Sequence, residues 1–171
     1  TARAIDEQMV DMTKQVWRDV GVRSGNGVTH VVPVGTLGNR QTNPNYIPGK
    51  SDKDFIPMGP RAGEAAKDFQ NAFERKFGIK PESLDINVLD PTDPSTWKGR
   101  VEAVANPEKY NTRGGNKWLQ QDLYNNDRNV WRLDPDSGSI AEKNIREVLG
   151  EPPKMTKADA EIGRASCRER V

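Results

Sequence analysis

Two short β-like runs joined by a polar loop constrain this chain more than any other feature. The first run, Val28 to Val34, is rich in β-branched residues and ends at Gly35-Thr36. The second begins Ser51-Asp52-Lys53-Asp54-Phe55. Because side chains alternate along a strand, Asp52 and Asp54 point to one face and Lys53 to the other. Two neighbouring carboxylates repel each other unless a cation lies between them, so this pair is a candidate divalent-metal site.

The simpler interpretation of the pair is a solvated turn with two surface aspartates, which is what an isolated Asp-x-Asp usually is. The strand that ends in Gly-Thr just upstream favours the metal site. The connecting loop, Leu37 to Lys50, contains the turn signals Asn43-Pro44-Asn45 and Pro48-Gly49. A loop of this length inside a compact domain is often a functional lid.

Gly35-Thr36 followed by Ser51-Asp52-Lys53-Asp54-Phe55 resembles the signature of the polymerase-beta-like nucleotidyltransferase superfamily. In that superfamily a strand ends in Gly-Ser or a close variant, a loop follows, and Asp-x-Asp opens the next strand. A third carboxylate lies on a later strand. The resemblance spans about residues 5–90. This chain has Thr36 where Ser is usual, a longer loop, and Lys53 where an apolar residue is usual.

The resemblance implies a Mg²⁺-dependent enzyme that moves a nucleoside monophosphate from a nucleoside triphosphate to an acceptor and releases pyrophosphate. It implies that Asp52, Asp54 and Asp85 hold two Mg²⁺ ions, with Asp90 as the alternative third carboxylate. Gly35 would let the backbone approach the phosphates, and Thr36 would donate hydrogen bonds to them. The cations expected to neutralise the remaining phosphate charge are Arg40, Lys50 and Arg61.

Hydrophobic periodicity predicts an α/β (α+β) fold, a small mixed sheet with helices packed on it. A helix is expected over Ile5–Val20, with its apolar stripe at Ile5, Met9, Met12, Val16, Trp17 and Val20. A second helix is expected over Ala62–Phe77, ended by Gly78, with Phe69 and Phe73 facing the sheet. A third strand, Leu84–Leu89, carries Asp85 and Asn87 on one face.

The pattern is weaker after Asp90. A short helix is expected over Trp97–Ala105, and a strand over Val130–Leu133 is followed by the turn Asp134–Gly138. Ser139 and Glu142 fit a capping box that opens a final helix ending at Gly150. We therefore expect one domain over residues 1–150, with a core at 5–90, a helical or irregular extension at 91–150, and a linker at 151–160.

The last eleven residues, Glu161 to Val171, resemble the translation of a sequencing adapter and are expected to be an artefact. Taking their three arginines and two glutamates from the chain's 26 basic and 25 acidic residues leaves 23 of each. Neutrality argues against a dedicated nucleic-acid-binding domain, which shows a basic excess. The tail also holds the only cysteine, Cys167, so we expect no disulfide partner.

The alternative function is a non-catalytic structural or interaction domain within a larger phage or mobile-element polypeptide. The chain begins at Thr1, without Met, and is expected to be a metagenomic fragment of a longer polypeptide. No apolar run is long enough to cross a bilayer and no secretory signal is visible, so no membrane partner is expected and the expected location is cytoplasmic, in a host cell or with a virion. Geometry separates the two functions, because an enzyme requires the carboxylates to converge beside Gly35-Thr36.

Overall fold

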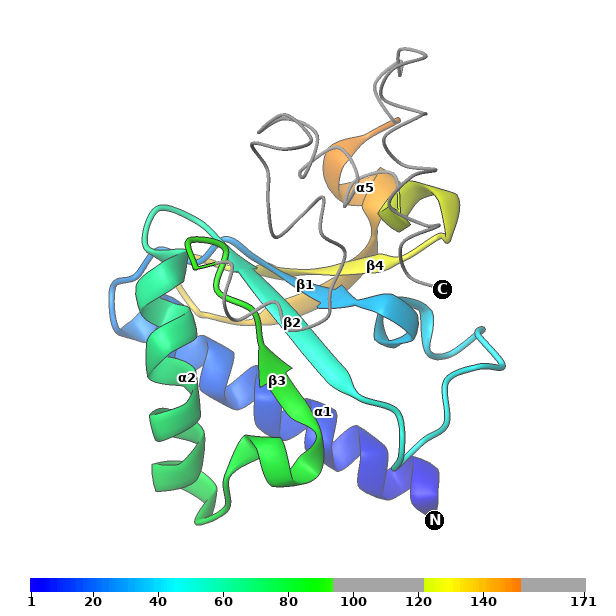
Figure 1. The fold of residues 1–171 in the computed structure, drawn as a ribbon. Helices are drawn as coiled ribbons and strands as arrows, with labels where there is room; N and C mark the ends of the chain where they lie inside the picture. The colour runs from blue at the N-terminus through cyan, green and yellow to red at the C-terminus, as the bar shows by residue number, and fades with distance from the viewer. Residues whose placement is uncertain (94–121, 152–171) are drawn as a thin grey trace.

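A mixed sheet with strand order β3-β2-β1-β4-β5 organises the fold (Figure 1). The computed structural model describes residues 1–93 and 122–151. The strands are β1 His30–Val34, β2 Lys53–Met58, β3 Ile86–Val88, β4 Asn129–Leu133 and β5 Ile140–Asn144. The β2–β3 pair is parallel, while β1–β2, β1–β4 and β4–β5 are antiparallel. The predicted fold class, a mixed sheet with helices packed on it, is therefore confirmed.

The first helix, α1, covers Ala2–Trp17 and continues into a π-helical turn, η1, over Arg18–Arg23. The predicted helix is thus present, with Trp17 fully buried as expected. The predicted stripe is wrong at its start, because Ile5 is 53 % exposed and the neighbouring Asp6 is buried instead. Thr13 is also buried, where its hydroxyl donates to the Val10 carbonyl at 2.6 Å. Two polar residues therefore share the buried side of α1 with its apolar residues, and hydropathy alone misplaces this part of the buried face.

The second helix, α2, spans Ala62–Phe77, the range expected from the sequence. It ends where Gly78 adopts a φ of 71°, a left-handed conformation that glycine adopts without strain. Phe69 and Phe73 are fully buried, and the Phe69 ring lies 4.5 Å from that of Trp17 between ring centroids. The aromatic rings therefore join α2 to α1 as well as to the sheet.

Both faces of the sheet are buried, each by its own apolar cluster. One cluster joins α1 and α2 to four strands and includes Val10, Val16, Trp17, Val31, Phe55, Phe69, Phe73, Ile86 and Trp131. The other face carries a second cluster: Val32, Ile56, Leu89, Leu123, Tyr124, Val130 and Ile145. Figure 1 shows α1 and α2 on the side of the sheet away from α5 (Ile145–Leu149). Burial on both faces explains why five consecutive residues of β2, 53–57, are all buried.

Two strands from the later part of the chain, β4 and β5, belong to the same sheet as the strands of residues 5–90. The predicted strand over Val130–Leu133 is confirmed as β4, which pairs with β1 at the centre of the sheet. The expected helix from Ser139 is wrong, because residues 140–144 form strand β5 and Asn144 caps the shorter helix α5. The expected helix over Trp97–Ala105, the linker from residue 152 and the tail lie outside the described residues.

Candidate functional site

The sheet register brings the end of β1 beside the Asp-x-Asp motif. Val34, the last residue of β1, pairs with Asp54 of β2, and Asp54 pairs in turn with Asn87 of β3. The chain leaves β1 at Gly35, which has a φ of 69°. An added Cβ there would meet nothing within 4 Å, so the backbone conformation, and not close packing, favours glycine at this position. The Gly35-Thr36 turn therefore begins next to Asp54.

The two aspartates of the motif have different surroundings. Asp54 is 4 % exposed and its Oδ1 accepts a hydrogen bond from the Asn87 Nδ2 at 3.2 Å. Asp52 directly precedes β2 and is exposed. Alternation along β2 places Asp54 on the face away from α1 and α2. This part of the sheet thus offers one buried carboxylate, one exposed carboxylate and an amide, all of which carry oxygen atoms.

Asp85 is not part of strand β3, although the sequence predicts it on the same strand face as Asn87. The predicted strand Leu84–Leu89 is shortened to β3, because Pro81–Leu84 forms a 3₁₀ turn, η3. Asp85 ends that turn with a φ of 55°, so its side chain does not follow the alternation of β3. Its carbonyl accepts from the Lys53 backbone N–H at 2.8 Å, while the residue itself is exposed. Asp85 therefore serves the backbone pairing of β2 in this structure.

No group of three or more His, Cys, Asp or Glu residues gathers for a metal ion within residues 1–93 and 122–151. The alternative third carboxylate, Asp90, is buried just beyond β3 and accepts from the Thr92 backbone N–H at 2.8 Å and from its hydroxyl at 2.6 Å. These contacts make a turn around Asp90, the role that its position before Pro91 indicates. Sequence reasoning placed Asn87 on the right face of β3 but gave it no role beside Asp54.

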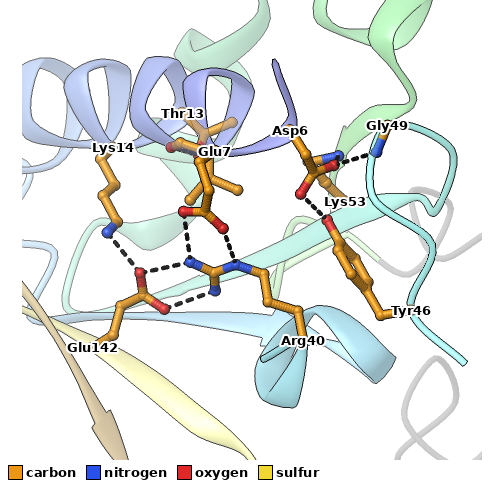
Figure 2. Close-up of polar contacts among 10 residues, drawn as sticks. Asp6, Glu7, Thr13, Lys14, Arg40, Tyr46, Gly49, Lys53 and Glu142 are labelled. Carbon is orange, nitrogen blue, oxygen red and sulfur yellow. Dashed lines mark hydrogen bonds and ion pairs between the residues drawn. The ribbon is translucent and has the colours of Figure 1, made fainter. Parts of the chain in front are cut away.

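The Lys53 side chain lies on the face of β2 opposite to Asp54, where its ammonium group donates to the buried carboxylate of Asp6 (Figure 2). Its Nζ lies 2.7 Å from the Asp6 Oδ1, and the two side chains are 1 % and 2 % exposed. Asp6 also accepts from the Tyr46 hydroxyl and from the Gly49 N–H, both at 2.8 Å. Burying a lysine is costly without such a partner, so the contact with Asp6 accounts for the burial of Lys53.

The contacts of this buried pair change the acidity of its members. Burial by itself would raise the pKa of Asp6, but hydrogen bonds from Lys53, Gly49 and Tyr46 and the charge of Lys53 outweigh burial and lower that pKa below its usual value. Burial and the neighbouring Asp6 carboxylate raise the pKa of the Tyr46 phenol. Asp6 is thus ionised and Tyr46 neutral at pH 7, as their hydrogen bond requires.

Arg40 belongs to a second polar cluster on the side of the sheet that faces α1 (Figure 2). Its Nε lies 3.1 Å from the Glu7 Oε1, and its Nη1 and Nη2 lie 2.8 and 3.0 Å from the two carboxylate oxygens of Glu142. Lys14 also donates to Glu142, at 2.6 Å. The prediction that Arg40 neutralises a triphosphate is therefore corrected, because Glu7 and Glu142 already pair with its guanidinium.

The two clusters tie the segment between β1 and β2 to the rest of the fold. Arg40 links it to α1 and β5, while Tyr46 and Gly49 link it to α1 through Asp6. The segment begins with a 3₁₀ turn, η2, over Gly35–Asn39. The expected lid is thus anchored on the side of α1. Lys50 lies in an exposed turn of this segment, and Arg61 is exposed at the start of α2.

Comparison of the chain with protein-family models, with curated proteins and with solved structures found no match. Within the ranges that the structure describes, no helix has the length and apolar character needed to cross a membrane.

Proposed function

We propose that this chain is a metal-dependent nucleotidyltransferase whose site lies at the end of β1, between the Gly35-Thr36 turn and Asp52 and Asp54. The observation that carries the proposal is the register that pairs Val34 with Asp54 and Asp54 with Asn87. It supports the proposal because two separate motifs of the resemblance, the Gly-Thr turn and the Asp-x-Asp, begin at adjacent positions of the same sheet.

The donor set fits Mg²⁺, which usually takes one or two carboxylates, keeps several waters and receives its remaining oxygens from substrate phosphates. Asp52 and Asp54 would hold the ion, and its chemistry there is to neutralise charge on the phosphates as that charge develops. This binding mode differs from the two ions on three carboxylates that the resemblance implies, because Asp85 ends a 3₁₀ turn and is not a strand residue beside Asp54. The hydrogen bond from Asn87 holds the Asp54 carboxylate in one orientation.

The reaction is the transfer of a nucleoside monophosphate. An acceptor oxygen forms a bond to the α-phosphorus, the bond from that phosphorus to the β-bridging oxygen breaks, and pyrophosphate leaves with the electron pair. The acceptor loses its proton to water. Gly35 has no side chain to block the phosphates, and the Thr36 hydroxyl and N–H would donate to their oxygens.

The second candidate is a non-catalytic structural or interaction domain of a longer polypeptide. It is favoured by the conformation of Asp85 and by the absence, within residues 1–93 and 122–151, of a three-membered acidic or metal-ligating group. Under this alternative the two aspartates are ordinary polar residues at the end of a strand.

Incubation of the full chain with each α-labelled nucleoside triphosphate, Mg²⁺ and a cell extract as acceptor source separates the two functions. We expect labelled product with at least one nucleotide, loss of that product with Asp54→Asn, and its retention with Asp136→Asn, a matched change in an exposed turn. Absence of label with every nucleotide contradicts transferase activity and leaves the non-catalytic domain.

A further inference from the structure

The proposed site needs a cation for the triphosphate, and a buried arginine next to it has hydrogen-bonding capacity left over. Arg128 immediately precedes β4 and is 8 % exposed. Its side chain packs on η2, the turn that Gly35 and Thr36 begin. A Cβ added at Gly38 would lie 2.9 Å from the Arg128 Cδ, so the absence of a side chain at Gly38 makes room for the arginine. Arg128 is therefore built into the turn that is expected to meet the phosphates.

The main chain and Asn39 fix the position of Arg128. Its N–H donates to the Leu123 carbonyl at 2.9 Å, and its carbonyl accepts from the Ile145 N–H at 3.0 Å. The Asn39 Oδ1 accepts from the Arg128 Nη1 at 2.8 Å, and the Asn39 Nδ2 donates to the Asn126 carbonyl at 2.8 Å. Such a site holds a guanidinium in one orientation before any ligand arrives, which lowers the entropy lost on binding.

The charge of Arg128 is only partly compensated, in contrast to that of Arg40. Asp122 lies nearby, with its Oδ2 3.5 Å from the Arg128 Nε, but the geometry is not that of a hydrogen bond and this buried Nε has no hydrogen-bond partner. Within the part of the chain that the structure describes, Nη2 makes no hydrogen bond either. Arg40, by comparison, donates to both oxygens of Glu142 and to Glu7. A buried cation with unused donors is suited to an anionic ligand.

The strand order sets how far this arginine lies from the aspartates. β1 lies between β2, which carries Asp54, and β4, which Arg128 precedes. Adjacent strands are about 4.8 Å apart, so the two positions are separated by roughly 10 Å with the end of β1 between them. An extended triphosphate can cover such a span across the Gly35-Thr36 turn.

We propose that Arg128 binds the phosphates of the nucleoside triphosphate that leave as pyrophosphate. This inference rests on the proposed function, which puts the transferred α-phosphate at Asp52 and Asp54 and therefore the β- and γ-phosphates on the far side of the turn. The guanidinium presents a planar pair of N–H groups that matches two phosphate oxygens. Arg128 thus selects triphosphates over monophosphates.

Equilibrium binding of fluorescent ATP and AMP analogues to the full chain, each with Mg²⁺, tests the inference. We expect Arg128→Gln to weaken ATP binding at least tenfold while the AMP affinity changes less than twofold, with Arg128→Lys between wild type and Arg128→Gln. The matched control is Arg146→Gln, a half-exposed arginine paired with Asp127 at 2.6 Å, which should change neither affinity.

Because Arg128 packs against η2, its replacement by Gln can affect folding, so circular dichroism is measured first and a second variant is included. Asp122→Asn keeps the shape of the side chain but removes the carboxylate nearest Arg128, so ATP affinity should rise at least twofold, whereas a purely structural arginine predicts no gain. Equal ATP affinity in wild type, Arg128→Gln and Asp122→Asn overturns the role of Arg128 alone. Failure of the wild type to bind any of the four nucleoside triphosphates, tested in the same assay, overturns the proposed function, and this inference with it.

Discussion

The buried Lys53–Asp6 pair allows the sharpest stability prediction. Replacing Lys53 with Met keeps the length of the side chain but removes its charge and the 2.7 Å contact with Asp6. The carboxylate then stays buried with only Tyr46 and Gly49 as donors. Breaking a buried ion pair in this way costs about 3–5 kcal/mol. Since Asp6 keeps two neutral donors, we expect about 3 kcal/mol, a large part of the stability of a domain this size.

Urea denaturation at pH 7 measures this loss, read as a fall in the midpoint at unchanged slope. The matched control is Lys50→Met, an exposed lysine three residues earlier, which should change stability by less than about 0.5 kcal/mol. The double variant Asp6→Asn with Lys53→Met removes both charges, so its cost should be smaller than the sum of the single changes. A cost below about 1 kcal/mol for Lys53→Met would refute the buried pair and the position of α1 against β2.

Three further predictions concern other parts of the fold. Burial by itself would raise the pKa of Glu142, but its contacts with Arg40 and Lys14 outweigh burial and lower that pKa from 4.5 to about 2. The ionised carboxylate therefore contributes about 3 kcal/mol of stability above pH 4.5, and this contribution is lost as the pH falls toward 2. Glu142→Gln should flatten the pH dependence of the urea midpoint in that range. Phe69→Ala and Phe73→Ala should each cost about 3–5 kcal/mol in urea, because both rings are fully buried, and a cost below about 1 kcal/mol would contradict the packing of α2. Deletion of residues 161–171 should leave the melting temperature unchanged within error, whereas a drop of several degrees would mean that the tail packs on the domain.

The elements that periodicity specifies strongly were predictable. Helix α2 has an uninterrupted apolar stripe and a terminal glycine, and its bounds agree with the expected Ala62–Phe77. The alternation of Asp52, Lys53 and Asp54 likewise predicted that Lys53 faces away from Asp54, as the Asp6 contact shows. These features depend on neighbouring residues, so the sequence contains them directly.

The features that depend on partners distant in sequence were not predictable. Residues 140–144 resemble a capped helix start, yet they form a strand because β4 pairs with them and because Glu142 reaches Arg40, 102 residues away. The buried face of α1 includes Asp6, whose partner Lys53 is 47 residues away. Polar clusters of this kind have no hydropathy signal, and the same holds for Arg128, whose contacts with Asn39 exist only in the folded chain. Asp85 differs again, because the 3₁₀ turn before β3 gives it a backbone conformation that strand alternation does not anticipate.

Thermal melting of the full chain with millimolar Mg²⁺ and each nucleoside triphosphate in turn tests most directly whether the end of β1 binds a nucleotide. At a ligand concentration of about 100 times the Kd, binding stabilises the folded state by about 2.7 kcal/mol, which raises the melting temperature of a chain of this length by about 5 °C or more. We expect this rise for the wild type and for Asp136→Asn with at least one nucleotide, and its loss in Asp54→Asn. If no nucleotide shifts the wild type, or if Asp54→Asn responds as fully as the wild type, the Asp-x-Asp motif beside Gly35-Thr36 is not a nucleotide site.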